Sequence, residues 1–129
     1  LTDYTEQKLN DWLTGKADMP ATTTRYLALF TAAPSDAGGG TEVSGGSYAR
    51  VAITDDMETA SGTDGTVTNT GDILLPTATG PWGTVTHFAV MDAASGGNMI
   101  EWDALDSGVG IASGQTFRFA SGALEQVVD

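Results

Sequence analysis

The residues that could carry catalysis in this sequence of 129 residues are one histidine, several serines and many carboxylates. His87 is the sole histidine, which excludes metal motifs built on two histidines. It lies within an apolar run, so we interpret it as a hydrogen-bonded core or interface residue rather than a catalytic base. No serine occupies a G-x-S-x-G frame, and no cysteine is present. The nucleophile elbow of hydrolases, cysteine nucleophiles and thiolate metal sites are therefore excluded.

The carboxylates gather in two segments, either of which could be imagined as an acid–base pair or a Ca²⁺ site. These residues are Asp55, Asp56, Glu58 and Asp64 in one segment, and Glu101, Asp103 and Asp106 in the other. The EF-hand spacing is missing, and the glycine run 38–40 lacks the Lys-Ser/Thr of a phosphate loop. We interpret both clusters as solvated surface, with calcium binding as the alternative. The sequence thus predicts no enzyme, no cofactor and no metal site.

The charge of the chain is strongly one-sided. Its net charge is −12, from 17 acidic and 5 basic residues, and the basic residues are scattered singly. No basic stripe is available to neutralise phosphates, and the acidic surface repels anionic lipids, so we expect no nucleic-acid or membrane partner. No window approaches the ~20 apolar residues of a membrane helix, and the acidic N-terminal segment does not resemble a signal peptide. We expect a protein that folds in a cytoplasm.

Turning to the elements that position these groups, residues 3–14 are predicted to form the one helix. Thr2 or Asp3 can serve as the N-cap, Glu6 completes a capping box, and Gly15 is suited to end the helix. A helix this short must dock to be stable. It could pack over an open end of the β domain or reach a neighbouring subunit. We divide the chain into an N-terminal helix and lead-in arm, 1–24, and a β-sandwich domain, 25–129.

The stretch 26–53 is central to the predicted domain. Two strands are predicted at 25–31 and 48–54, and the first is apolar on both faces, as expected of a core strand. The linker between them, 32–47, is rich in glycine and small polar residues, which excludes a helix or an ordinary strand. A linker of this length within a compact domain is usually functional or mobile.

Further short apolar runs at intervals of about 8–12 residues, separated by turn signals, complete the pattern of an all-β protein. Strands are predicted at 66–69, 73–75, 84–92, 99–105, 110–112, 115–120 and 123–128. We therefore predict an antiparallel β-sandwich, jelly-roll-like, with one short N-terminal helix.

Three segments resemble a family of small virion proteins of tailed bacteriophages, known as tail fibre or decoration proteins. They are YLALFTAAPSDAGGGTEVSGGSYARVAI (26–53), NTGDILLPTATGPWGTVTHF (69–88) and FAVMDAASGGNMIEWD (88–103), followed by GQTFRFASGAL (114–124). The resemblance implies a structural protein of the virion without catalytic residues. The segment 54–65 is more acidic than the family pattern, so no contact is carried over to it.

Among virion roles, the sequence favours a head decoration (cement) protein, because heptads and the repeats of a fibre shaft are missing. Its expected partners are the major capsid protein and other copies of the chain, in a homo-oligomer such as a trimer. The alternatives are a tail fibre or tail-adaptor module that contacts the host surface, and a carbohydrate-binding β-sandwich.

We expect the linker 32–47 to order when it binds, and tryptophans to anchor self-contacts. We also expect that residues 36–46 can be deleted without unfolding the domain. The predicted interface residues are Trp12, Pro34, Asp36, Gly38, Gly39, Gly40, Glu42, Tyr48, Trp82 and Trp102.

Overall fold

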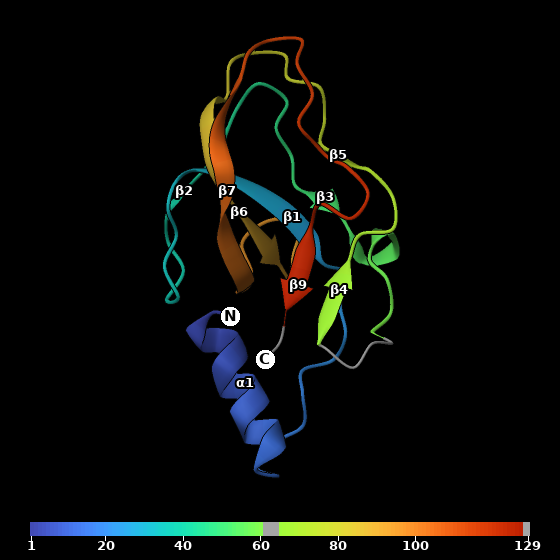
Figure 1. Ribbon diagram of the computed structural model, residues 1–129. Coiled ribbons are helices and arrows are strands. Elements are labelled where there is room, and N and C mark those ends of the chain that lie inside the picture. The colour runs from blue at the N-terminus through green and yellow to red at the C-terminus, as the bar shows by residue number, and fades with distance from the viewer. Residues whose placement is uncertain (61–64, 128–129) are drawn as a thin grey trace.

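The computed structural model describes residues 1–60 and 65–127, and consists of one helix followed by nine strands (Figure 1). The helix is α1 (Asp3–Leu13), and a short 3₁₀ helix occupies Thr54–Asp56. The strands are β1 (Tyr26–Ala32), β2 (Thr41–Glu42), β3 (Val51–Ala52), β4 (Thr66–Thr68), β5 (Ile73–Leu74), β6 (Gly83–Met91), β7 (Met99–Ile111), β8 (Arg118–Phe119) and β9 (Glu125–Val127).

The main sheet is antiparallel and is built around β1. Its strand order is β2-β1-β6-β7, and β3 pairs with β1 on the same side as β2. Leu27, Ala28, Leu29 and Phe30 are all buried, so both faces of β1 are covered, as predicted for a core strand. The strands β6 and β7 form a long hairpin through the turn at 92–98.

One face of the main sheet carries the larger hydrophobic core. Two small antiparallel sheets, β4-β9 and β5-β8, contribute the opposite side of this core. Its buried residues are Leu27, Leu29, Val43, Ile53, Ile73, Leu75, Ala78, Trp82, Val85, Ile111, Phe117 and Leu124. The prediction of an all-β antiparallel fold with one N-terminal helix is confirmed, and the layer facing the main sheet consists of two separate pairs of strands.

The other face of the sheet carries a second, smaller cluster. It consists of Ala28, Phe30, Ala89, Met91 and Met99, with Tyr26 and Trp102 packed against it. This face matters for function, because the glycine-rich segment and the start of α1 lie over part of it.

The helix α1 is attached at its first turn and exposes the rest. Thr2 is the N-cap, as predicted, and Gly15 follows the helix with φ +72°. The Thr2 hydroxyl donates to the carbonyl oxygens of Met99 (2.5 Å) and Ile100 (3.1 Å), at the edge of the main sheet. No side chain of α1 is buried, and the helix extends away from the strands (Figure 1). No helix in the described part of the chain is both long and apolar enough to span a membrane.

The glycine-rich segment is the main departure from the predicted elements. It contains the strand β2, where we predicted no strand, and Val43 immediately after β2 is buried in the larger core. The predicted strand at 48–54 is only two residues long in the structure. The predicted strands at 99–105 and 110–112 are joined in the single strand β7. Because Val43 and the β1–β2 pairing belong to the fold, deletion of 36–46 would remove part of the core.

Candidate functional site

A cavity with a volume of about 500 Å³ lies over the second face of the main sheet. Its walls come from three separate parts of the chain, namely the start of α1, the glycine-rich segment and the turn at 92–98. The residues that line it are Thr2, Asp3, Tyr4, Phe30, Asp36, Ala37, Gly38, Gly39, Gly40, Glu42, Arg50, Met91, Gly96, Gly97, Asn98 and Met99.

The floor of this cavity is apolar and its walls are polar. Phe30, Met91 and Met99 belong to the smaller hydrophobic cluster and form the floor. The walls include the acidic residues Asp3 and Asp36 together with several glycines. This combination can bury the apolar face of a ligand while its polar groups are hydrogen-bonded at the walls.

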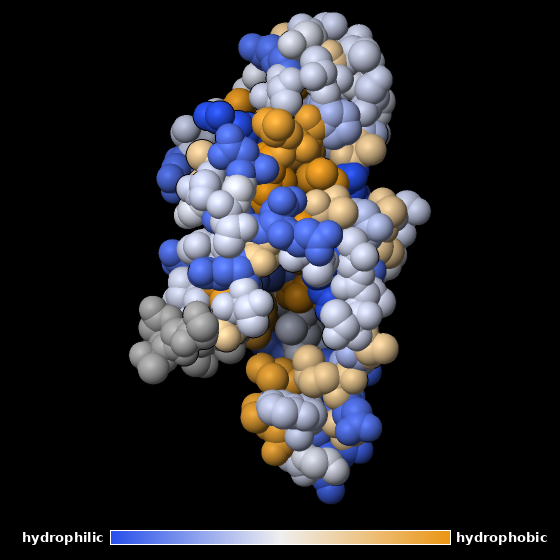
Figure 2. Space-filling model, turned by 90° about the vertical axis from the view of Figure 1, so that its right-hand side faces the viewer, coloured by the Kyte–Doolittle hydropathy of each residue, from blue (hydrophilic) through white to orange (hydrophobic). Residues whose placement is uncertain are grey.

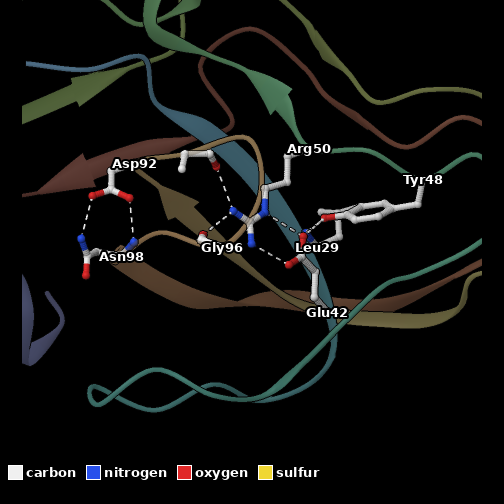
Figure 3. A network of polar contacts seen from close by, with 8 residues as sticks. Leu29, Glu42, Tyr48, Arg50, Asp92, Gly96 and Asn98 are labelled. Atoms are coloured by element: carbon white, nitrogen blue, oxygen red, sulfur yellow. Dashed lines mark hydrogen bonds and ion pairs between the residues drawn. The ribbon is translucent and has the colours of Figure 1, made fainter.

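A buried ion pair fixes the glycine-rich wall to the rest of the domain (Figure 3). The Arg50 guanidinium donates to both carboxylate oxygens of Glu42, at 2.9 and 2.8 Å, and its side chain is only 8% exposed. It also donates to the carbonyl oxygens of Ala93 (2.8 Å) and Gly96 (2.9 Å) in the turn at 92–98. One side chain therefore joins two walls of the cavity.

Tyr48 extends this network to the central strand. Its hydroxyl donates to the Glu42 carboxylate (2.7 Å) and accepts from the Leu29 amide (3.0 Å). Burial alone would raise the pKa of Glu42, but the hydrogen bonds from Arg50 and Tyr48 outweigh it and hold the pKa below its ordinary value. Burial and the hydrogen bond to Glu42 raise the pKa of Tyr48. Glu42 is thus ionised and Tyr48 neutral at pH 7, which is a structural arrangement rather than a reactive one.

The turn at 92–98 is held by a second carboxylate. Asp92 accepts from the backbone amide of Asn98 (2.6 Å) and from its side-chain amide (3.0 Å). Gly97 has φ +73°, and a Cβ at this position would collide with Asp92 and Ala93. The turn therefore requires glycine here, and it presents the backbone of 96–98 to the cavity.

Asp36 attaches the tip of the glycine-rich segment at two points. Its carbonyl oxygen accepts from the amide of Asp3 (2.9 Å), at the start of α1. Its carboxylate accepts from the indole Nε1 of Trp102 (3.1 Å) on β7. The Trp102 ring in turn lies against the ring of His87, with centroids 5.9 Å apart. His87 is half-buried and hydrogen-bonds Thr86 through Nδ1 (2.8 Å).

The structure brings together half of the predicted interface residues. Those that line the cavity are Asp36, Gly38, Gly39, Gly40 and Glu42. Pro34 is buried next to Gly40, while Tyr48 and Trp102 support the cavity from outside. The remaining two lie elsewhere, because Trp82 is buried in the larger core and Trp12 is exposed on α1.

The prediction missed lining residues from other parts of the chain, among them Arg50, Met91, Gly97, Asn98 and Met99. For the turn a signal was available, because consecutive glycines precede Asn98. Arg50 gave a weaker signal as one of the five basic residues in an acidic chain.

The predicted acidic clusters are placed away from this cavity. Glu101, Asp103 and Asp106 line a separate cavity of about 300 Å³ with Phe88 and Phe119. Burial raises the pKa of Glu101; the positive charge of the N-terminus opposes this, and nearby Asp103 adds to it. In the described part of the chain, no three acidic, histidine or cysteine residues lie close enough to hold a metal ion. Asp64 of the other cluster lies outside the described residues.

Comparison with known protein families gives one match that covers almost the whole chain. The family model for podophage GP4 fiber I protein gp80 matches residues 1–126. The chain belongs to this family. The resemblance to virion proteins of tailed phages is therefore confirmed, and the chain is a member of a phage structural fibre family. No curated protein matches it.

Proposed function

We propose that the chain is a fibre module of a tailed-phage virion, which contacts the host surface through the cavity face of its β domain. The observation that supports this most directly is the family match, which runs from residue 1 to residue 126 and so includes every element of the fold except the last residue of β9. This function corresponds to the tail-fibre alternative drawn from the sequence, and it makes the chain a virion component.

The helix α1 supplies the attachment side in this proposal. Thr2 and Thr5 hold its first turn to the carbonyl of Ile100, whereas Trp12 and Leu13 at its other end are 53% and 63% exposed. Hydrophobic residues gather at this end of the molecule, separately from a second group on the β domain (Figure 2). Tryptophan is among the residues that most often anchor protein interfaces. Residues 1–24 would thus contact another copy of the chain or another virion protein, while residues 25–129 form the presenting domain.

A second candidate is the head decoration role, with the major capsid protein as partner. The feature that favours it is the fixed glycine-rich segment, which is already tied to β1, α1 and β7. A segment that is ordered before binding loses little conformational entropy on contact. Such contacts can be individually weak when many copies act on one lattice.

The number of copies in purified virions distinguishes the two candidates. We would measure it by quantitative mass spectrometry against the major shell protein, and locate the chain with antibody labelling by electron microscopy. We expect few copies, located at the tail. A ratio close to that of the shell protein, with label over the head, would overturn the fibre proposal and establish the decoration role.

A further inference from the structure

The cavity over the second face of the main sheet has a composition that selects for one chemical class of ligand. Its volume of about 500 Å³ lies within the usual range of small-molecule sites. Each of the floor residues Phe30, Met91 and Met99 is at most 8% exposed, and all three are packed in the smaller hydrophobic cluster. The apolar floor of the cavity is therefore the surface of this cluster. A ligand must therefore offer an apolar face to this floor.

The walls offer many hydrogen-bond acceptors and a few free donors. The residues Asp3, Tyr4 and Asp36 line the cavity, and the Asp36 carboxylate accepts a hydrogen bond from Trp102. The backbone amides of Gly39, Gly40 and Gly97 make no hydrogen bond within the part of the chain that the structure describes. A ligand with several hydroxyl groups can donate to the carboxylates and accept from these amides.

The charge of the walls excludes an anionic ligand. Arg50 is the one cation among the lining residues, and its guanidinium is already bonded to Glu42 and to the carbonyls of Ala93 and Gly96. The remaining charges at the walls are carboxylates, in a chain of net charge −12. An anion would meet repulsion with no counter-charge available.

We propose that this cavity binds a neutral saccharide unit. The apolar C–H face of the sugar ring lies on Phe30, Met91 and Met99. Its hydroxyl groups bond Asp36, Asp3 and the glycine amides. The assignment deepens the proposed fibre function, on which it rests, because it names the class of host-surface molecule that the module contacts.

The test is a titration of the whole ¹⁵N-labelled chain, observed by NMR. The neutral probes are glucose, galactose, mannose and N-acetylglucosamine, and glucuronic acid is the anionic counterpart. We expect at least one neutral sugar to shift the amide signals of Gly39, Gly40 and Gly97 and the Trp102 indole signal, saturating at millimolar concentration. Glucuronic acid should bind at least about tenfold more weakly.

Two matched variants locate the binding. Asp36→Ala should weaken it by about tenfold or more, because it removes a charged acceptor from the wall. Asp106→Ala, which removes an exposed carboxylate of β7 outside the cavity, should leave it unchanged.

Three results would overturn the assignment. They are no saturable shift at the cavity signals with any of the four neutral sugars, equal binding of glucuronic acid, or equal binding by Asp36→Ala and the unaltered chain. If the virions nevertheless carry few copies at the tail, only the saccharide assignment fails and the fibre function stands.

Discussion

At the scale of single residues, the Glu42–Arg50 pair contributes most to holding the cavity together. Arg50 is 8% exposed and Glu42 26%, and the pair joins β2 to the turn at 92–98. We expect Glu42→Gln to destabilise the fold by about 2–4 kcal/mol, because it leaves the guanidinium buried without a counter-charge. Urea denaturation would measure this loss.

The control for that substitution is the second ion pair, Arg118–Asp72, whose side chains are 57% and 45% exposed. Arg118→Gln should cost at most about 1 kcal/mol, since an exposed pair is screened by water. Equal losses for the two variants would contradict a special role for Glu42.

Two glutamates should give opposite dependences of stability on pH. The folded pKa of Glu42 is held below its ordinary value of 4.5 by Arg50 and Tyr48 despite burial. Its contribution is therefore complete above pH 4.5 and is lost as the pH falls through the lower folded pKa. Burial raises the folded pKa of Glu101, so its protonation stabilises the fold as the pH falls through that raised value.

Denaturation curves between pH 7 and pH 3 would show this difference. The stability deficit of Glu42→Gln should shrink as the pH falls, and any advantage of Glu101→Gln at pH 7 should also disappear there. At low pH the stability of each variant thus approaches that of the unaltered chain, from below for Glu42→Gln and from above for Glu101→Gln. Curves that stay parallel to it across this range would refute both assignments.

At the scale of elements, α1 depends on Thr2, which together with Thr5 joins the helix to β7. Thr2→Val removes the hydroxyl that donates to Met99 and Ile100 and caps the helix at the Thr5 amide. We expect a loss of about 1–2 kcal/mol in local stability. Hydrogen exchange should become faster in α1, while the amides of β1 and β6 keep their protection.

Thr14→Val is the matched control for the helix, because the Thr14 hydroxyl donates to Asn10 at the exposed end. Exchange in the first turn of α1 should be unaffected by this change. Faster hydrogen exchange in β1 and β6 after Thr2→Val would instead show that α1 is part of the cooperative core.

The glycine-rich segment offers a comparison between neighbours that share a backbone conformation. Gly39 and Gly40 have φ of +80° and +79°, but a Cβ at Gly40 would lie 2.9 Å from the Ala32 carbonyl oxygen and the Pro34 nitrogen. At Gly39 nothing lies within 4 Å of it. Both alanine variants incur the left-handed strain of about 1–2 kcal/mol, and Gly40→Ala adds a steric clash.

Thermal denaturation of the two variants measures the cost of the clash, because the backbone strain is common to both. Gly40→Ala should be less stable than Gly39→Ala by about 1 kcal/mol or more. Equal stabilities would mean that the segment shifts away from β1 without cost.

The elements that were predicted correctly are those with local signals. Thr2 and Gly15 mark the ends of α1, and the apolar run of β1 is buried on both faces. The predicted strand at 48–54 is shorter because the Leu29 backbone of β1, which a longer β3 would pair with, bonds the Tyr48 hydroxyl and the Val43 amide instead. The glycines identified one wall of the cavity. Its floor follows from the pairing of β1, β6 and β7, which no local pattern of residues encodes.

At the scale of the whole molecule, repulsion between like charges lowers the stability of the fold. The chain has 17 acidic against 5 basic residues, and the described part contains two ion pairs. Repulsion among the remaining carboxylates therefore destabilises the compact state, and dissolved salt screens it.

We accordingly expect the melting temperature at pH 7 to rise when NaCl is raised from about 0.01 to 0.3 M, over which the Debye length falls several-fold. The matched control replaces the exposed Asp18, Asp55 and Asp106 by asparagine, which lowers the repulsion without removing any hydrogen bond of the described residues. This variant should start from a higher melting temperature and gain less from salt, because less repulsion remains to be screened. A melting temperature that falls with salt would mean that attraction within pairs such as Glu42–Arg50 outweighs the repulsion, and that the acidic surface is not a cost to the fold.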